Sequence, residues 1–163
     1  PFRPISQKKV SDPTYEGIDD PSLPLTIFYE QDLSVDQYLK IRGDSLFLSP
    51  LLCFSAAMPF KAGERRLPID MEHSRDFNML INFKLPKDYE LAEVPKPFQL
   101  ALSGRSLTYN LQANQIGEMV SIQSRLLLKA TYIYPEDYPA LREFYQKMID
   151  REAEPLVFVK KKS

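Results

Sequence analysis

Cys53 and His73, each the only residue of its type, mark the chemistry that this chain could perform. Asp70 and Asp76 lie close to the histidine in sequence, so the chain contains the side chains of a thiol nucleophile, its base and an orienting group. Cys53, however, lies in the apolar run at residues 51–54. A buried thiol behaves as a small hydrophobic group and forms little thiolate. We therefore expect a core cysteine and a histidine in a surface loop, and we assign no catalytic residue.

The pattern of metal ligands and glycines favours neither a metal site nor a cofactor site. A single histidine and a single cysteine do not make the usual zinc sites, and no Asp/Asn/Gly loop matches a calcium site. The five glycines are scattered singly, so there is no glycine-rich phosphate loop. Four early carboxylates are candidates for acid–base hydrolysis, and no pair among them stands out: Glu16, Asp19, Asp20 and Glu30. We expect Asp19 and Asp20 to be turn residues, and we predict no metal and no cofactor.

The chain of 163 residues has the composition of one folded domain, with 44% hydrophobic and 12% aromatic residues. Its 21 basic and 22 acidic residues give a formal net charge of −1, so no domain-wide positive field attracts a nucleic acid. The one basic run, at residues 160–162, is expected to be a solvated tail. The longest apolar stretch, at residues 46–58, is interrupted and shorter than the roughly 20 residues of a membrane-spanning helix. We predict neither a nucleic-acid partner nor a membrane span in this chain.

Prolines and turn residues set the first segment apart from the rest. No hydrophobic period is sustained in it, and it is punctuated by four prolines, Pro1, Pro4, Pro13 and Pro21. We expect residues 1–22 to be a linker or an extended lead-in and residues 23–163 to form the domain. The chain begins with a proline and shows no secretion signal, so we expect a piece of a larger protein whose own signal would lie upstream.

Alternating apolar and polar residues predict a series of β-strands from residue 25 onward. The clearest is residues 76–85, where Phe77, Met79, Ile81 and Phe83 share one face. Short turns join the strands between residues 98 and 133, which predicts an antiparallel meander. The predicted strands are residues 25–29, 37–42, 45–48, 51–57, 76–85, 89–91, 98–102, 107–112, 118–133 and 156–159.

One α-helix is predicted near residues 137–152. Asp137 is the expected N-cap, and Pro139 lies in the first turn, where its missing N–H costs little. The apolar residues recur every three or four positions and form one stripe: Leu141, Phe144, Tyr145, Met148 and Ile149. Together the elements predict a mainly β fold, an antiparallel β-sandwich, immunoglobulin-like or related, with one C-terminal α-helix.

Two groups of residues suit binding rather than catalysis. Arg65 and Arg66 could hold a carboxylate or a phosphate, although an ion pair or an exposed loop is the expected role. Eight aromatic residues could line a groove for a sugar or a peptide, but alternation assigns several of them to one face and we expect most of them in the core. They are Tyr29, Tyr38, Phe47, Phe54, Phe60, Phe77, Phe83 and Tyr89.

Four short motifs share their order and spacing with a known family. They are RLPID at residues 66–70, LPKDYE at 85–90, VPKP at 94–97 and YPALREF at 138–144. Over roughly residues 45–160 the chain resembles the C-terminal β domain of uncharacterised function that follows the core of bacterial transglutaminase-like proteins, which have a cysteine-protease fold. Met71 is a departure, because relatives tend to place an aromatic residue after the acidic residue of the first motif.

The resemblance implies a setting for the domain. In that family the core holds the catalytic Cys, His and Asp, another β domain precedes it, and the parent is usually an envelope or exported protein. The resemblance thus implies a periplasmic or cell-envelope location and a partner that is the upstream core of the same parent chain. The expected function is a non-catalytic accessory domain that supports or positions the core. The alternatives are a carbohydrate- or peptide-binding module of a cell-surface system and a small hydrolase built on Cys53 and His73. No ligand is predicted.

Overall fold

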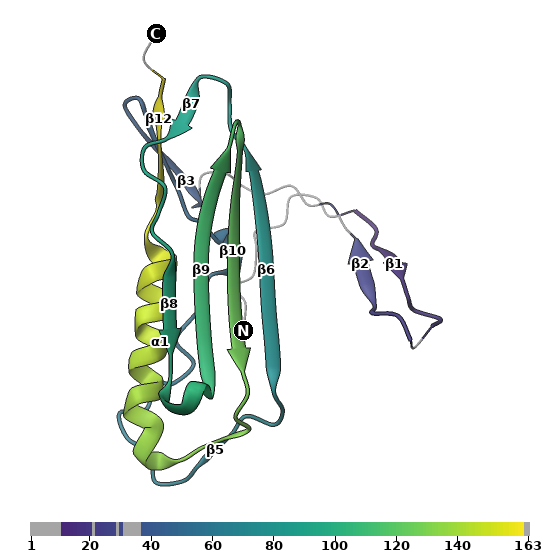
Figure 1. Cartoon of the computed structure of the whole chain (residues 1–163), viewed down its shortest axis with the longest axis vertical. Coiled ribbons are helices and arrows are strands. Elements are labelled where there is room, and N and C mark those ends of the chain that lie inside the picture. Colours follow the sequence, from purple (N-terminus) through teal and green to yellow (C-terminus); the bar gives the residue numbers. More distant parts are fainter. Residues whose placement is uncertain (1–10, 21, 29, 31–36, 162–163) are drawn as a thin grey trace.

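The computed structural model describes residues 11–161 apart from residues 21, 29 and 31–36 and the side chain of Cys53. Its largest element is a four-stranded antiparallel sheet in the order β6-β10-β9-β8 (Figure 1). The strands β8, β9 and β10 are neighbours in the sheet as well as in the chain, which confirms the predicted meander. The bounds are β6 (Arg75–Lys84), β8 (Phe98–Ala101), β9 (Leu107–Ile116) and β10 (Met119–Leu128).

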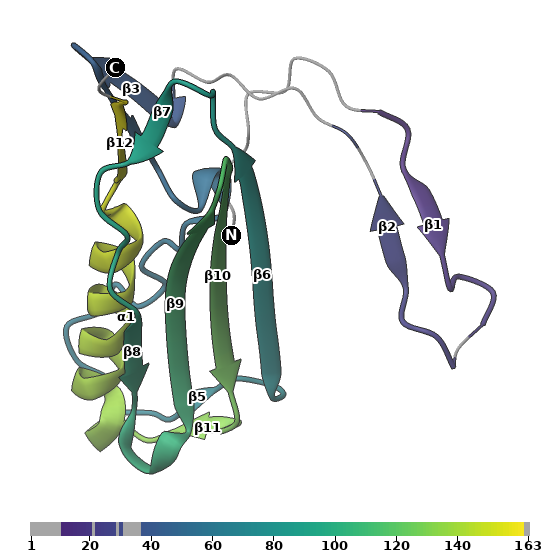
Figure 2. The ribbon, with the colours of Figure 1, turned by 45° about the horizontal axis from the view of Figure 1, so that its top comes forward.

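A second four-stranded antiparallel sheet has the order β3-β4-β12-β7. It consists of β3 (Leu39–Arg42), β4 (Ser45–Leu48), β7 (Tyr89–Leu91) and β12 (Leu156–Lys160). Strand β12 lies between β4 and β7, so the residues after the helix complete this sheet. At the opposite end of the body, β5 (Ile69–Asp70) pairs with β11 (Tyr132–Ile133), as Figure 2 shows.

The α-helix α1 (Tyr138–Ala153) runs alongside β8 and contributes one face to the core (Figure 1). Leu141, Phe144 and Met148 are buried, which confirms the predicted apolar stripe. Asp137 lies at the predicted N-cap position, but it ends a 3₁₀ turn with helical φ and ψ, and its carboxylate does not make the expected capping hydrogen bond. A residue whose side chain caps a helix usually has extended backbone angles. None of the helices in the described residues is long and apolar enough to cross a membrane.

The core lies between the inner face of the large sheet, α1 and the second sheet. The largest fully buried side chains come from all three, and they include Leu107, Tyr109, Val120, Ile122, Leu141, Met148 and Phe158. Buried and exposed positions alternate along β9, as expected for a sheet with one face toward solvent. The predicted fold class, mainly β with antiparallel sheets and one C-terminal helix, is confirmed, and the arrangement is consistent with a β-sandwich.

Three predicted strands differ from the observed ones by more than two residues. Residues 51–57 contain a 3₁₀ turn at Leu52–Phe54, because a short apolar run does not by itself distinguish a strand from a buried turn. Strand β9 continues to Ile116, because Gly117, with a φ of 60°, allows a tight turn directly into β10. The long strand at residues 118–133 is interrupted, because the N–H groups after β10 turn aside and donate to the Ser106 carbonyl.

Described residues between 11 and 30 form a hairpin, here called the arm, which projects from the body (Figures 1 and 2). Its strands are β1 (Thr14–Glu16) and β2 (Thr26–Phe28), with Tyr15 opposite Ile27. Ser11 and Glu30 extend the pairing, since the Ser11 N–H donates to the Glu30 carbonyl at 2.8 Å. The segment 1–22 expected as a linker therefore includes β1, and residues 1–10 lie outside the described residues.

Candidate functional site

The aspartates considered for a catalytic triad have partners other than His73. The Asp76 carboxylate accepts hydrogen bonds from Arg125 at 2.6 and 2.9 Å, and these bonds lower its pKa. Asp70 accepts a hydrogen bond of 3.2 Å from the Tyr132 hydroxyl. His73 is exposed in the turn before β6, as expected for a surface-loop histidine. The arrangement of these residues is that of a surface turn with ordinary ion pairing.

Cys53 and Asp20, which were considered as catalytic or metal-binding residues, lie in a 3₁₀ turn and in a loop turn. The backbone of Cys53 lies in the 3₁₀ turn, but its side chain is outside the described residues, so its burial stays a prediction. Asp20 accepts hydrogen bonds from the Ser22 hydroxyl and N–H, which lower its pKa, and this fits the expected turn role. Within the described part of the chain, no group of three or more His, Cys, Asp or Glu residues could hold a metal ion.

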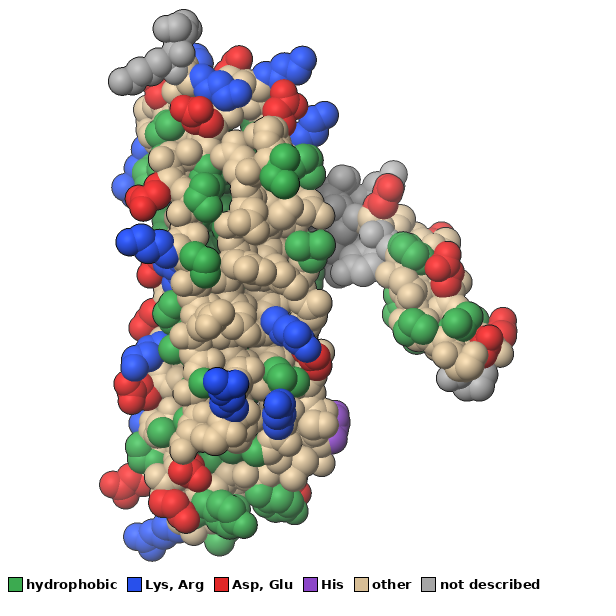
Figure 3. All heavy atoms as spheres, in the orientation of Figure 1, with side chains coloured by type: hydrophobic (Ala, Val, Ile, Leu, Met, Phe, Trp, Pro, Cys, Tyr) green, Lys and Arg blue, Asp and Glu red, His purple; other side chains and the backbone are tan. Residues whose placement is uncertain are grey.

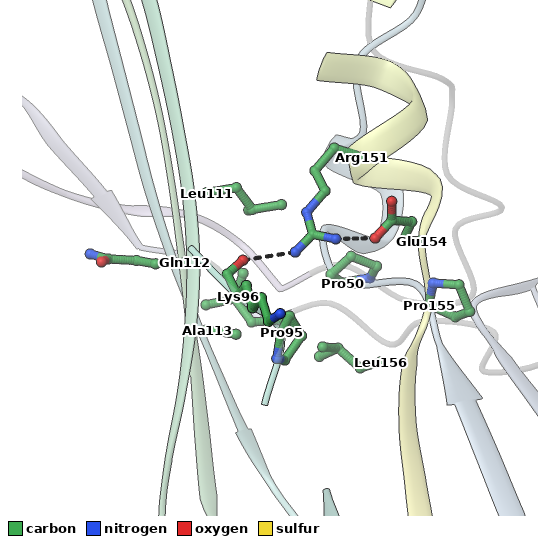
Figure 4. A pocket seen from close by; sticks show the side chains of 11 residues that line it. Pro50, Pro95, Lys96, Leu111, Gln112, Ala113, Arg151, Glu154, Pro155 and Leu156 are labelled. Carbon is green, nitrogen blue, oxygen red and sulfur yellow. Dashed lines mark hydrogen bonds and ion pairs between the residues drawn. The ribbon is translucent and has the colours of Figure 1, made fainter. Parts of the chain in front are cut away.

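A small cavity lies where the end of α1 meets β9 and the loop before β8 (Figure 4). Its volume is about 40 Å³, which is room for a few water molecules and not for a sugar or a peptide. The Arg151 guanidinium reaches across it, donates to the Lys96 carbonyl at 2.9 Å and pairs with Glu154 (Figure 4). The same group lies 5.6 Å from the centroid of the Phe98 ring. Arg151 therefore holds the loop before β8 against α1.

The aromatic residues considered for a groove serve mainly as packing residues. Phe60 packs edge-on against Tyr138 and Tyr145, with ring centroids 6.1 and 5.0 Å apart. Arg65 lies 5.8 Å from the centroid of the Tyr138 ring, so its role is structural. Of the eight candidates, Phe54 and Phe77 are exposed, Tyr29 lies outside the described residues, and the other five are half-buried.

The outer face of the large sheet carries no tyrosine or phenylalanine. Its side chains are those of the even-numbered positions of β6 and β9 and the odd-numbered positions of β8 and β10. Amides predominate and join across strands: Gln112 donates to Gln123 at 2.7 Å, and Gln123 donates to Asn78 at 3.2 Å. In Figure 3 this face is mostly tan, with scattered hydrophobic side chains. It offers no aromatic platform for a sugar ring.

The one acidic side chain that is buried in the described residues, Glu152, was not predicted to be so. Its Oε2 atom accepts from the Ala56 N–H at 2.6 Å, and its Oε1 atom accepts from the Tyr109 hydroxyl at 2.9 Å. Burial raises the pKa of Glu152, and the two hydrogen bonds partly oppose this rise. The signal in the sequence is its position four residues after Met148, on the apolar stripe of the helix. Each of its carboxylate oxygens accepts a hydrogen bond, so the role of Glu152 is to join α1 to the sheet.

The arm carries a cluster of exposed apolar side chains that the described residues do not cover. Six large apolar side chains on it are each between 49% and 66% exposed: Tyr15, Ile18, Leu23, Leu25, Ile27 and Phe28. Residues 11–30 also contain five acidic residues and no lysine or arginine. An exposed cluster of this kind is typical of a protein interaction site. We therefore take the arm as the candidate functional site.

Comparisons with known proteins give a family and a fold. Among proteins with curated descriptions, none matches the chain. The crystal structure of a "putative protease" from Parabacteroides distasonis is similar to 77% of this chain, with a TM-score of 0.57 and 12% sequence identity. The chain spans 25% of the length of that protein, and at this identity the likeness shows the fold alone. The arm precedes the residues matched by the family, which are 44–158, and the chain belongs to DUF3858, a domain of unknown function with a solved structure.

Proposed function

We propose that this chain is a non-catalytic interaction domain of a larger protein, and that its arm packs against a core that precedes the domain in the same parent chain. The observation that carries the proposal is the exposed apolar surface of the arm. A two-stranded hairpin is marginally stable in water unless it packs against another element. Burial of one large apolar side chain contributes about 1.5–3 kcal/mol, so docking of Tyr15, Ile27 and their neighbours would stabilise the arm substantially.

The comparisons support a setting in a longer chain. In the Parabacteroides protein, the region of this fold occupies a quarter of the length. The motifs at residues 66–70 and 138–144 resemble the domain that follows a transglutaminase-like core, and the structural neighbour is called a "putative protease". A transglutaminase-like core is therefore the partner that we propose. The carbohydrate-binding alternative has less support, because the outer sheet face has no aromatic side chain on which a sugar could stack.

The proposal includes the absence of catalysis by this chain itself. It is supported by the ion pair that holds Asp76 and by the exposure of His73. Native chain should therefore react with a thiol reagent only after unfolding. Rapid reaction of Cys53 in the native state, abolished together with any hydrolase activity by Cys53→Ala, would overturn this part of the proposal.

The first test of the accessory role is the size of the native protein in source cells, measured with an antibody raised to this chain. A band far above 18.9 kDa is expected, whereas a band at 18.9 kDa would overturn the proposal.

The role of the arm is tested by binding of this chain to the separately produced upstream core, measured by calorimetry. Ile27→Asp should weaken binding about tenfold or more, since it places a charge in the apolar contact. Leu67→Asp, which adds the same charge at an exposed position on the body, should leave binding unchanged. Equal affinity of the two variants would show that the arm is not the contact.

A further inference from the structure

Among the described residues, strand β6 is a sheet edge with no partner on one side and without the usual protective features. It forms one side of the large sheet, and Figures 1 and 2 show no described strand beside it. It is ten residues long, and its central residues, 77–83, include no charged residue and no proline. Edge strands in soluble proteins are generally shortened, bulged, charged or covered, because an open edge pairs readily with another strand. The surface of β6 therefore suits pairing.

The free backbone groups of β6 belong to its even-numbered residues. Just beyond the strand, the Leu85 N–H donates to the Glu118 carbonyl on the β10 side at 2.8 Å. Backbone polar groups alternate in direction along an antiparallel strand, so odd-numbered residues face β10. Asn78, Leu80 and Asn82 thus direct their N–H and C=O groups toward the open edge.

The sequence of β6 is nearly symmetrical about Leu80. The residues at equal distances on either side of Leu80 form four pairs, which are, from the centre outward, Met79 and Ile81, Asn78 and Asn82, Phe77 and Phe83, and Asp76 and Lys84. The first three pairs match in size and polarity, and the last pair is opposite in charge. An antiparallel strand pairing with itself places each member of such a pair opposite the other, so the strand is complementary to a second copy of itself.

We propose that two copies of this chain associate through β6, with the Leu80 residues facing each other across a two-fold axis. The Leu80 side chain, 63% exposed on the outer face, packs against Leu80 of the second copy. Asp76 lies opposite Lys84 of the second copy at each end, and the amides of Asn78 and Asn82 face each other. The two large sheets then form one eight-stranded antiparallel sheet.

The same pairing also extends the apolar inner face of the sheet. Phe77 is 53% exposed although it lies on the face of β6 that contributes Met79, Ile81 and Phe83 to the core. In the dimer it lies opposite Phe83 of the second copy, so an apolar row continues from one body to the next. A register shifted by two residues would place Asp76 opposite Asn82 and lose the charge pairing. The arm takes no part in this contact, so the inference does not rest on the proposed function.

The test is the mass of the full chain in solution, measured by sedimentation over a wide range of protein concentration. The wild-type chain should approach twice 18.9 kDa as the concentration rises. Leu80→Lys places two ammonium groups against each other on the axis and should abolish the dimer. Ile116→Lys adds the same charge at an 82% exposed position of the same face, away from the edge, and should leave the dimer intact. A wild-type chain that stays monomeric, or a dimer that survives Leu80→Lys, would overturn the proposal.

A charge exchange tests the register of the two strands. It also tests whether the dimer forms through β6 if the Leu80→Lys variant does not fold. Lys84→Glu sets two acidic groups against each other, and Asp76→Lys sets two basic groups against each other, so each variant alone should be monomeric. Mixed in equal amounts, the two variants place Glu opposite Lys at one end and Asp opposite Lys at the other, and a heterodimer should form. Asp76→Lys also removes the bond to Arg125, which is exposed and contributes little to the fold. A mixture that stays monomeric while the wild-type chain dimerises would exclude this register.

Discussion

The Tyr109 hydroxyl on β9 donates a hydrogen bond of 2.9 Å to the Glu152 carboxylate in the last turn of α1, and both side chains are buried. The second carboxylate oxygen accepts from the Ala56 N–H at 2.6 Å, so one side chain joins the helix, the sheet and a long loop. Ser124 completes the group, since its hydroxyl donates to the Tyr109 oxygen at 3.3 Å. A buried polar group of this kind is stabilising only while every donor keeps its acceptor.

Glu152→Ala should lower the free energy of unfolding by about 2–4 kcal/mol, because it leaves the Tyr109 hydroxyl and the Ala56 N–H without acceptors inside the protein. Urea unfolding followed by circular dichroism measures the loss. Glu143→Ala is the matched control, since Glu143 is exposed on the same helix and pairs only with Lys147. The control should unfold almost as the wild-type chain does. Similar losses in both variants would contradict the stabilising role of the buried carboxylate.

The buried carboxylate also predicts the direction of a pH dependence. Burial raises the pKa of Glu152 above its ordinary value of 4.5, so the folded state holds the proton more tightly than the unfolded state. Its contribution to stability is therefore complete below 4.5 and is lost as the pH rises through the raised pKa. The stability of the wild-type chain relative to Glu152→Gln should fall over this range.

Unfolding curves of both chains at a series of pH values measure this difference. Glu143→Gln provides a control of opposite sign, because Lys147 lowers the pKa of Glu143. The contribution of Glu143 is present above 4.5 and is lost as the pH falls through the lowered pKa. A wild-type stability that rises relative to Glu152→Gln between acid and neutral pH would show that the carboxylate is held ionised.

Gly17→Ala should disrupt the pairing of β1 with β2 in the arm and leave the fold of the body unchanged. Gly17 has a φ of +76°, and a Cβ atom there would lie 2.6 Å from the Pro24 carbonyl oxygen. Proton contacts between Tyr15 and Ile27, observed by nuclear magnetic resonance, should disappear. Gly43→Ala is the comparison, because Gly43 has a φ of +57° but open space around it. That variant should lose about 1 kcal/mol from backbone strain and keep the arm paired. Persistence of the contacts in Gly17→Ala would contradict the clash.

Arg151→Lys should release the loop that precedes β8. A lysine carries a single ammonium group and does not reproduce the fork that bonds the Lys96 carbonyl and Glu154 together. Hydrogen exchange of the amides in residues 92–97 should become faster, as measured by mass spectrometry. Arg142→Lys, which loses only a long bond of 3.4 Å to the Gly63 carbonyl, should leave that loop unchanged. Equal exchange in the two variants would mean that the loop is held by its other contacts.

The sequence predicts strands well where the signal is local. The strands β4 and β7 occur at the residues predicted, 45–48 and 89–91, and β6 is shifted by one residue, because each has an alternating pattern bounded by turn residues. The order of the strands is not local. Leu156 pairs with Leu48, and no pattern within either segment specifies that partner, since alternation defines a face and not a neighbour.

The candidate site was accessible to prediction only in part. The alternation of Leu25 and Ile27 predicts a strand with an apolar face, but it does not indicate whether that face is covered. Pairing with Tyr15 depends on the turn at Gly17, which brings together two segments that the sequence assigned to a linker and to the domain. Glu152 falls on the apolar stripe of α1, yet its partner Tyr109 is far away in sequence and is identified only by the fold.

The cross-strand amides on the outer face of the large sheet have a consequence for measurements in solution. Gln112, Gln123 and Asn78 bond to one another through groups that neither gain nor lose protons between about pH 2 and 12. Their bonding also involves no net charge, so added salt screens nothing there. Apart from Lys84 at the end of β6 and the ion pair between Asp76 and Arg125, this face carries no charged side chain. Changes with ionic strength should therefore originate mainly elsewhere, above all at the arm with its five acidic residues and no basic ones.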